Sequence, residues 1–136
     1  MLKQVAAVIL ALACAGCDDG NPFDYVPVSG RLTYDDGTPI PTGGIRLGFT
    51  VQDVGPKGDA FPRPGEALVD AQGNFSECMS YRPGDGLIPG KHKVTIFYAT
   101  DAKGKLLIPK EYSHPSTTPL VIDTADAPLE IKVPKP

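Results

Sequence analysis

The chain has 136 residues, a formal net charge of −3 at pH 7 and a hydrophobic content of 41%. This length suits one ordinary domain and is too short for two, and the hydrophobic share is enough for a real core. The composition argues against nucleic acid as a partner, because phosphate binding needs clustered Lys and Arg and the sequence has no basic stripe. Glycine and proline, 15 residues of each, are spread between apolar runs, which favours many turns over one disordered tail.

The N-terminus has the composition of an export signal. Lys3 gives a short leading segment one positive charge, and an apolar run follows from Val5 to Cys14. This run of about ten residues is half of the roughly 20 that a membrane-spanning helix needs. A cleaved signal therefore fits better than an uncleaved anchor.

The small residues after this run carry a resemblance. Ala15-Gly16-Cys17 is similar to the lipobox of bacterial lipoproteins. The resemblance implies that residues 1–16 form a lipoprotein signal peptide, that Cys17 becomes the mature N-terminus, and that its thiol carries a diacylglycerol. Two or three acyl chains hold a domain on a bilayer where one chain would be marginal. The membrane, through Cys17, is thus the first expected partner.

One position departs from the lipobox pattern. Cys14 stands three residues before Cys17, where lipoboxes usually carry Leu. The alternative is an ordinary secretory signal cut near Ala13 or Ala15, which would release a soluble protein. We expect the lipidated form, and hence a protein exported from the cytoplasm and anchored in the cell envelope, where an envelope protein is a further possible partner.

Residues 17–25 are expected to be a polar tether and residues 26–136 one domain. In that domain, alternation of polar and apolar residues predicts strands. The clearest run turns Ile45, Leu47, Phe49 and Val51 inward. Further strands are expected at 26–34, 66–70, 74–80, 91–98, 120–122 and 129–133. Seven strands and no helical period predict an all-β fold, a seven-stranded antiparallel Greek-key sandwich.

The middle of the chain predicts a hairpin. Strand residues end at Asp70, Gly73 takes the positive-φ position of the turn, and the next strand starts at Phe75. Alternation from Phe75 would turn Glu77 inward, which needs a bulge or a sheet edge to resolve. Cys78 would then face outward or lie in the bulge, and we expect it to act as a small apolar residue rather than as a thiol that pairs with another chain. The same reasoning puts Tyr98 on the inner face of the strand at 91–98.

The sequence predicts no catalytic residue, no metal site and no cofactor. His92 is expected to be hydrogen-bonded at a sheet end. Ser113 and His114 are sequence neighbours, and a nucleophile and base that close rarely face each other usefully. A zinc site would need three or four ligands, whereas Cys78, His92 and His114 stand at no ligand-like spacing. We therefore expect a protein that is not an enzyme.

A long loop follows the strand that ends near residue 52. It runs from residue 53 to residue 65 and is rich in proline and glycine. Asp53 and Asp59 are potential calcium ligands, but the loop lacks the closely spaced acidic run that calcium loops carry. Sequence variation, rather than function, is the expected reason for its length.

Four segments together resemble a known family. They are Val28 to Leu32, Val69 to Phe75, Gly90 to Ile96, and Ile108 to Tyr112. In this order they are similar to carboxypeptidase regulatory-like domains, which belong to the transthyretin-like, or prealbumin-like, sandwiches. The resemblance implies a non-catalytic module. A related enzyme branch, hydroxyisourate hydrolase, ends in Tyr-Arg-Gly-Ser, whereas this chain ends in Ile-Lys-Val-Pro-Lys-Pro.

Three functions are compatible with these features. The expected one is a lipid-anchored envelope protein with a structural or partner-binding β-sandwich, in which loops or exposed sheet edges make contact. The alternative is a carbohydrate- or solute-binding lipoprotein, which the absence of tryptophan weakens and for which Tyr81, Tyr98 and Tyr112 are the candidate aromatic surfaces. A transthyretin-related hydrolase is the third.

Overall fold

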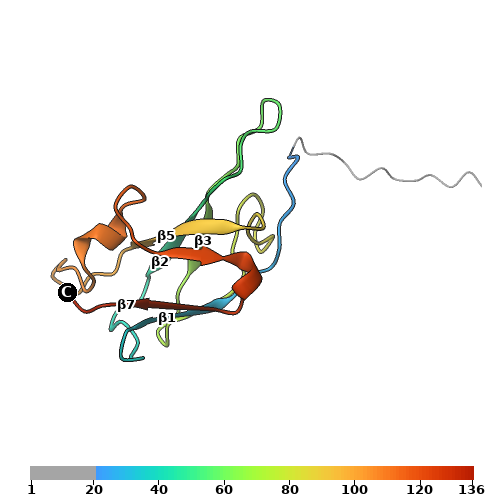
Figure 1. Ribbon diagram of the computed structural model, residues 1–136. Coiled ribbons are helices and arrows are strands. Elements are labelled where there is room, and N and C mark those ends of the chain that lie inside the picture. The colour runs from blue at the N-terminus through green and yellow to red at the C-terminus, as the bar shows by residue number, and fades with distance from the viewer. Residues whose placement is uncertain (1–20) are drawn as a thin grey trace, which may run out of the picture.

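The computed structural model describes residues 21–136, and there it forms two β-sheets stacked as two layers (Figure 1). The strands are β1 (Gly30–Tyr34), β2 (Arg46–Val51), β3 (Gly65–Leu68), β4 (Asn74–Phe75), β5 (Lys91–Phe97), β6 (Val121–Asp123) and β7 (Leu129–Val133). Two short 3-10 helices, η1 (Lys110–Ser113) and η2 (Thr124–Asp126), flank β6. The all-β prediction is confirmed. The predicted signal peptide and Cys17 lie outside the described residues.

The two sheets have the strand orders β4-β1-β7 and β3-β2-β5-β6. Every strand pair is antiparallel except β1 and β7, which run parallel from Gly30 opposite Leu129 to Tyr34 opposite Val133. The prediction of a wholly antiparallel sandwich is therefore wrong at this pair. The last strand enters its sheet from the same end as the first, a relation between distant segments that local alternation does not encode.

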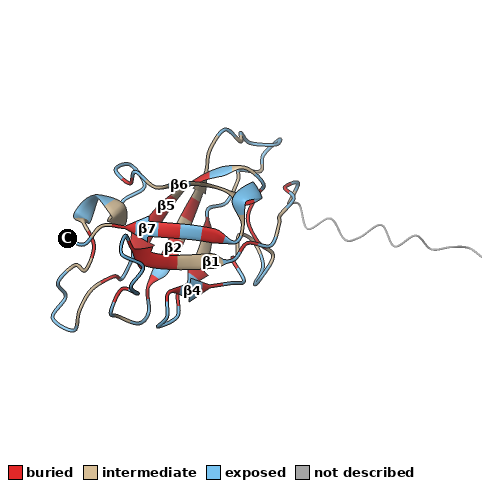
Figure 2. Ribbon diagram, turned by 60° about the horizontal axis from the view of Figure 1, so that its bottom comes forward, coloured by how far each residue is buried: buried red, intermediate tan, exposed pale blue. Residues whose placement is uncertain are grey.

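The core lies between the sheets and is made by the alternating residues of their inner faces. Figure 2 shows this alternation along β7, where buried and exposed residues follow one another. Leu32 and Ile131 face Leu47 and Phe49, all at most 2% exposed. The predicted inward residues of β2 are thus confirmed, apart from Val51, which is half-buried where the strand ends.

The predicted hairpin turn is present, but its two arms belong to different sheets. Asp70 Oδ1 accepts hydrogen bonds from the backbone N–H groups of Gln72 and Asn74, at 3.0 and 2.9 Å, and Gly73 has a φ of +89°. β3 lies in the four-stranded sheet and β4 in the three-stranded sheet, so only an isolated bridge from Val69 to Phe75 joins them. The turn carries the chain across the core.

The predicted strand over residues 74–80 stops at Phe75. Glu77 has a φ of +52°, which no extended strand allows, and this break exposes the Glu77 side chain. Cys78, the next residue, is fully buried. Glu77 therefore does not face inward, and Cys78 does not face outward, because the break shifts the alternation by one residue.

Tyr98 departs from its prediction for the same kind of reason. Its φ is +63°, and its side chain is 66% exposed rather than on the inner face. The positive φ ends β5 at Phe97 and turns the next residue, Ala99, into the core. His92, Val94 and Ile96 keep the predicted inward orientation.

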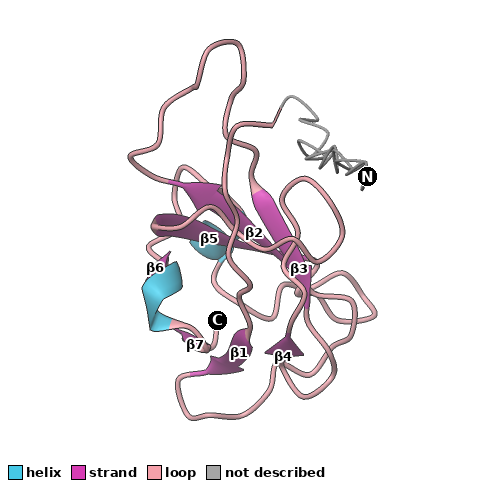
Figure 3. Cartoon of the chain, turned by 90° about the vertical axis from the view of Figure 1, so that its right-hand side faces the viewer, coloured by secondary structure: helices cyan, strands magenta, loops and turns pink. Residues whose placement is uncertain are grey.

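The sandwich has two distinct ends. We call one the tether end: residues 21–25, the loop 53–64 and the loop 81–90 lie there, as Figure 3 shows from that side. At the bases of these segments, Val26 bridges to Leu87, and Gln52 donates its backbone N–H to the Lys91 carbonyl at 2.8 Å. The opposite end, the distal end, holds residues 35–44, residues 98–107 and the C-terminus.

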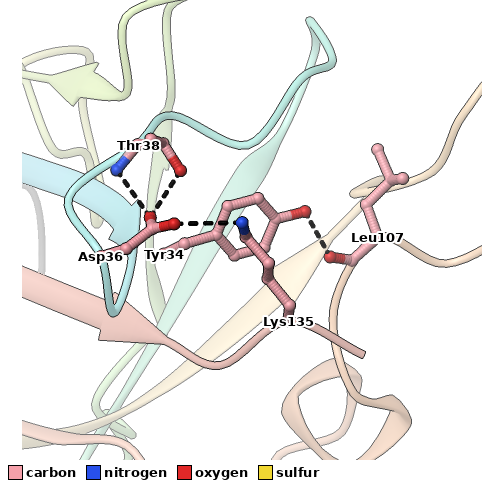
Figure 4. Close-up of polar contacts among 5 residues, drawn as sticks. All are labelled: Tyr34, Asp36, Thr38, Leu107 and Lys135. Carbon is pink, nitrogen blue, oxygen red and sulfur yellow. Dashed lines mark hydrogen bonds and ion pairs between the residues drawn. The ribbon is translucent and has the colours of Figure 1, made fainter.

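The distal end is closed by a polar cluster (Figure 4). Tyr34 donates its hydroxyl to the Leu107 carbonyl at 2.7 Å, and Lys135 lies 5.4 Å from the centre of the Tyr34 ring. Lys135 also pairs with Asp36 at 3.0 Å. Hydrogen bonds from the hydroxyl and backbone N–H of Thr38, together with Lys135, hold the pKa of Asp36 well below its usual range. This cluster fixes the chain end against β1.

Candidate functional surfaces

Residues 21–25, within the expected tether, pack against the domain. Phe23 is buried, and Lys57 of the long loop lies 5.3 Å from the centre of its ring. Lys57 also approaches the Pro22 carbonyl, and the Asn21 amide donates to the Tyr25 hydroxyl at 2.6 Å. Residues 21–25 are therefore part of the packed fold, and Asn21 is only four residues after Cys17.

A groove of about 480 Å³ opens beside these residues at the tether end. Asn21, loop residues 59–64 and Tyr81 line it. The guanidinium of Arg63 lies 4.7 Å from the centre of the Tyr81 ring, within cation–π range. Phe61, on the same groove, is 73% exposed, the highest value among the large hydrophobic side chains of residues 21–136.

The long loop is shaped by its own backbone. Lys57 and Ala60 exchange two backbone hydrogen bonds, at 2.9 and 3.1 Å, around Gly58, whose φ is +60°. Glycine adopts this conformation without steric cost. Phe61 directly follows Ala60, the last residue of this turn. The loop is thus a defined projection from the sandwich, with an aromatic side chain where it leaves its turn.

The neighbouring loop is organised by Asp85. Its carboxylate accepts backbone hydrogen bonds from Ser80, Tyr81 and Arg82 at 2.8 to 2.9 Å. Partial burial pushes the pKa of Asp85 upward, but these hydrogen bonds outweigh it and hold the pKa below its usual range. Asp85 therefore fixes Tyr81 under Arg63.

His92 is hydrogen-bonded at a sheet end, as predicted. It lies in the core, with Nε2 2.7 Å from the Ile88 carbonyl and its ring edge-on to Phe49. Burial lowers the pKa of His92, although the carbonyls of Ile88 and Phe49 and the charge of Asp123 oppose the shift. The imidazole is therefore neutral at pH 7 and, being 1% exposed, out of reach of a solute.

The other polar candidates from the sequence do not form a site. Burial raises the pKa of the free Cys78 thiol to about 11. The buried Ser113 hydroxyl makes no hydrogen bond, so it is not paired with the exposed His114. Over residues 21–136 no group of three His, Cys, Asp or Glu side chains is arranged to hold a metal ion. Asp53, considered above as a calcium ligand, therefore belongs to no such group.

The three tyrosines considered as a sugar platform lie apart. Tyr81 is at the tether end under Arg63, whereas Tyr98 is at the distal end, where its ring lies 6.4 Å from that of Phe97. Tyr112, in η1, packs half-buried against the core. They do not make one shared aromatic surface.

Phe61 was not singled out by the sequence. Its signal is an aromatic residue in a proline-rich loop, but its exposure follows from the Lys57–Ala60 turn and its position from the loop's approach to Asn21. Neither can be read from alternation, because the loop has none.

Comparison with known proteins adds no identification. No family model, curated protein or solved structure matches the chain. In the part of the chain that the structure describes, no helix has the length and apolar character to cross a bilayer.

Proposed function

We propose that this is a lipid-anchored protein of the cell envelope whose β-sandwich is a non-catalytic module with a structural or partner-binding role. The observation that carries the proposal is the packing of residues that lie close to Cys17 in the sequence. Asn21 is packed on the domain only four residues after Cys17. A lipid on Cys17 would therefore hold the sandwich directly against the bilayer, with its tether end toward the lipid.

The chemistry of the buried groups supports a non-catalytic role. The Cys78 thiol, with a pKa of about 11, is protonated at neutral pH, and a thiol is a weak nucleophile compared with its thiolate. His92 lies in the core, with one ring nitrogen committed to a backbone carbonyl. A general base must reach the proton that it removes, and His92 faces no open surface.

Membership of the carboxypeptidase regulatory-like domains, with Greek-key connections, is part of the proposal. The turn over Asp70 to Asn74, with Gly73 at positive φ, and the strand that follows Gly90 support it. So does the path of the chain, which passes from β1 to the other sheet and back at β4, then again to β5 and back at β7. A carbohydrate-binding role is less well supported, because Arg63 covers the Tyr81 ring and the tyrosines are dispersed.

The test is the intact mass of the protein purified from its native membrane, beside a Cys17→Ala variant. We expect a mass gain equal to a diacylglycerol with one further acyl chain or none, starting at residue 17, and its loss in the variant. Membrane association should be measured on the same samples. An unmodified mass with release into the soluble fraction would refute the anchor and leave a secreted domain.

A further inference from the structure

The loop 53–64 projects at the same end of the sandwich at which the tether enters. Figures 1 and 3 show it extending beyond the sheets next to residues 21–25. Asn21 and Phe61 line one groove, so the first residues of the described chain and the exposed aromatic ring are neighbours. Lys57 adds a second link, through the Phe23 ring and the Pro22 carbonyl.

The length of chain between Cys17 and this groove is short. Four residues, fully extended, reach at most about 14 Å. If Cys17 carries lipid, its Cα lies at the membrane surface, and Asn21 cannot be farther from that surface than this reach. Phe61 lies on the same groove and is 73% exposed. The tether thus holds an uncovered aromatic ring next to the lipid headgroups.

From this we infer that the loop 53–64 is a membrane-contact element, with Phe61 inserting into the interfacial region of the bilayer to which Cys17 is attached. This inference rests on the proposed lipid anchor. Phenylalanine is one of the residues that peripheral elements bury at the boundary of headgroups and acyl chains, and apolar area buried there adds to the binding that acyl chains provide. The contact would fix the orientation of the sandwich and point its distal end, with Tyr98 and the C-terminus, away from the membrane.

Charge is not the driving force of this contact. Lys57 and Arg63 are offset in the same loop by the exposed Asp53 and Asp59. A patch that is neutral in total gains little from an anionic surface. The contact is therefore apolar, and it should form on zwitterionic phosphatidylcholine as well as on a membrane that contains phosphatidylglycerol.

The chain has no tryptophan, so one introduced tryptophan reports on one position. The reporter variant is Phe61→Trp, and the matched control is Tyr98→Trp. Both variants replace an exposed aromatic residue. Phe61 is 73% exposed and lies at the tether end, and Tyr98 is 66% exposed and follows the last residue of β5 at the distal end. β5 alone separates the two ends by about 20 Å.

The experiment uses the full lipoprotein, purified from its native membrane and reconstituted into phosphatidylcholine vesicles with and without brominated acyl chains. For Phe61→Trp we expect emission at shorter wavelength and loss of intensity when the lipid is brominated. For Tyr98→Trp we expect neither. Vesicles with added phosphatidylglycerol should give the same pair of results.

The intact mass of each sample separates the two proposals. If the protein is acylated and both tryptophans respond equally to brominated lipid, the membrane contact of Phe61 is refuted while the anchor stands, and the loop is free for another partner. If the mass shows no acyl chain and the protein does not join the vesicles, the anchor is refuted and the contact with it. A response at position 61 that requires phosphatidylglycerol would overturn the apolar contact in favour of a charged one.

Discussion

The turn at Gly73 ties the middle of the chain to its first strand, and a single methyl group tests how. Gly73 has a φ of +89°, and a Cβ there would collide with the backbone carbonyl oxygen of Leu32. The same two residues are already hydrogen-bonded, since the Leu32 N–H donates to the Gly73 carbonyl at 2.7 Å. Gly73→Ala must therefore push apart two backbone segments that hold each other in place.

The expected loss follows from four terms. A left-handed backbone costs an ordinary residue about 1–2 kcal/mol. Alanine returns about 0.4–1 kcal/mol by restricting the unfolded chain. Displacing Leu32 weakens one buried hydrogen bond, worth about 1 kcal/mol, and strains the packing around β1 by about 1–2 kcal/mol more. Gly73→Ala should thus lower the free energy of unfolding by about 3 kcal/mol, a large part of the 5–15 kcal/mol typical of a domain.

Gly37 provides the matched control. Its φ of +85° is nearly the same, but a Cβ there meets nothing within 4 Å. Gly37→Ala therefore carries only the conformational terms, about 1 kcal/mol. Both variants and the wild type should be unfolded with urea and followed by circular dichroism. Equal losses of stability in the two variants would refute the steric argument and leave only the backbone preference.

Three further predictions concern residues around the break in the second arm and in the core. Glu77→Gly should raise the free energy of unfolding by about 1 kcal/mol, because it relieves a φ of +52° at an exposed side chain; an unchanged urea midpoint would contradict this. Cys78 should not react with a thiol-specific disulfide reagent in buffer but should react once urea is added, because the thiol is buried and its pKa is about 11. Immediate reaction in buffer would show that the structure around Cys78 opens readily. The pKa of His92 is lower in the folded protein than its unfolded value of about 6.5, so the unfolded chain takes up a proton first as the pH falls. The contribution of neutral His92 to the free energy of unfolding is therefore fully present above pH 6.5 and decreases below it. His92→Leu should flatten that part of the pH profile of urea unfolding, and a slope that persists would belong to other groups.

Alternation predicted the core wherever the chain stays extended. Ile45, Leu47 and Phe49 were identified by it, and so was the positive φ of Gly73, because glycine marks such positions. It failed after Glu77, where an ordinary residue takes a positive φ and shifts the alternation by one position. Nothing in the identity of that residue announces this conformation, since the surrounding structure imposes it.

Pairing between distant segments was harder to predict than the strands themselves. The hairpin around Asp70 was expected to be one unit within one sheet, yet its arms lie in two. The parallel contact of Gly30 with Leu129 joins the first and the last strand of the sequence. Local sequence states which residues face inward, whereas the assignment of strands to sheets depends on how all inner faces pack together. The proposed contact of Phe61 depends on the same global arrangement.

The parallel pairing of β1 with β7 also bears on when the three-stranded sheet can form. β1 has two neighbours, the two-residue strand β4 and the five-residue strand β7, which is the more distant of the two in sequence. Contacts between distant residues form slowly, because a long loop must close before they are made. The three-stranded sheet therefore cannot be completed before residues 129–133 have been synthesised. If the chain is exported, as proposed above, late closure of this sheet would help to keep it unfolded while it crosses a translocation channel.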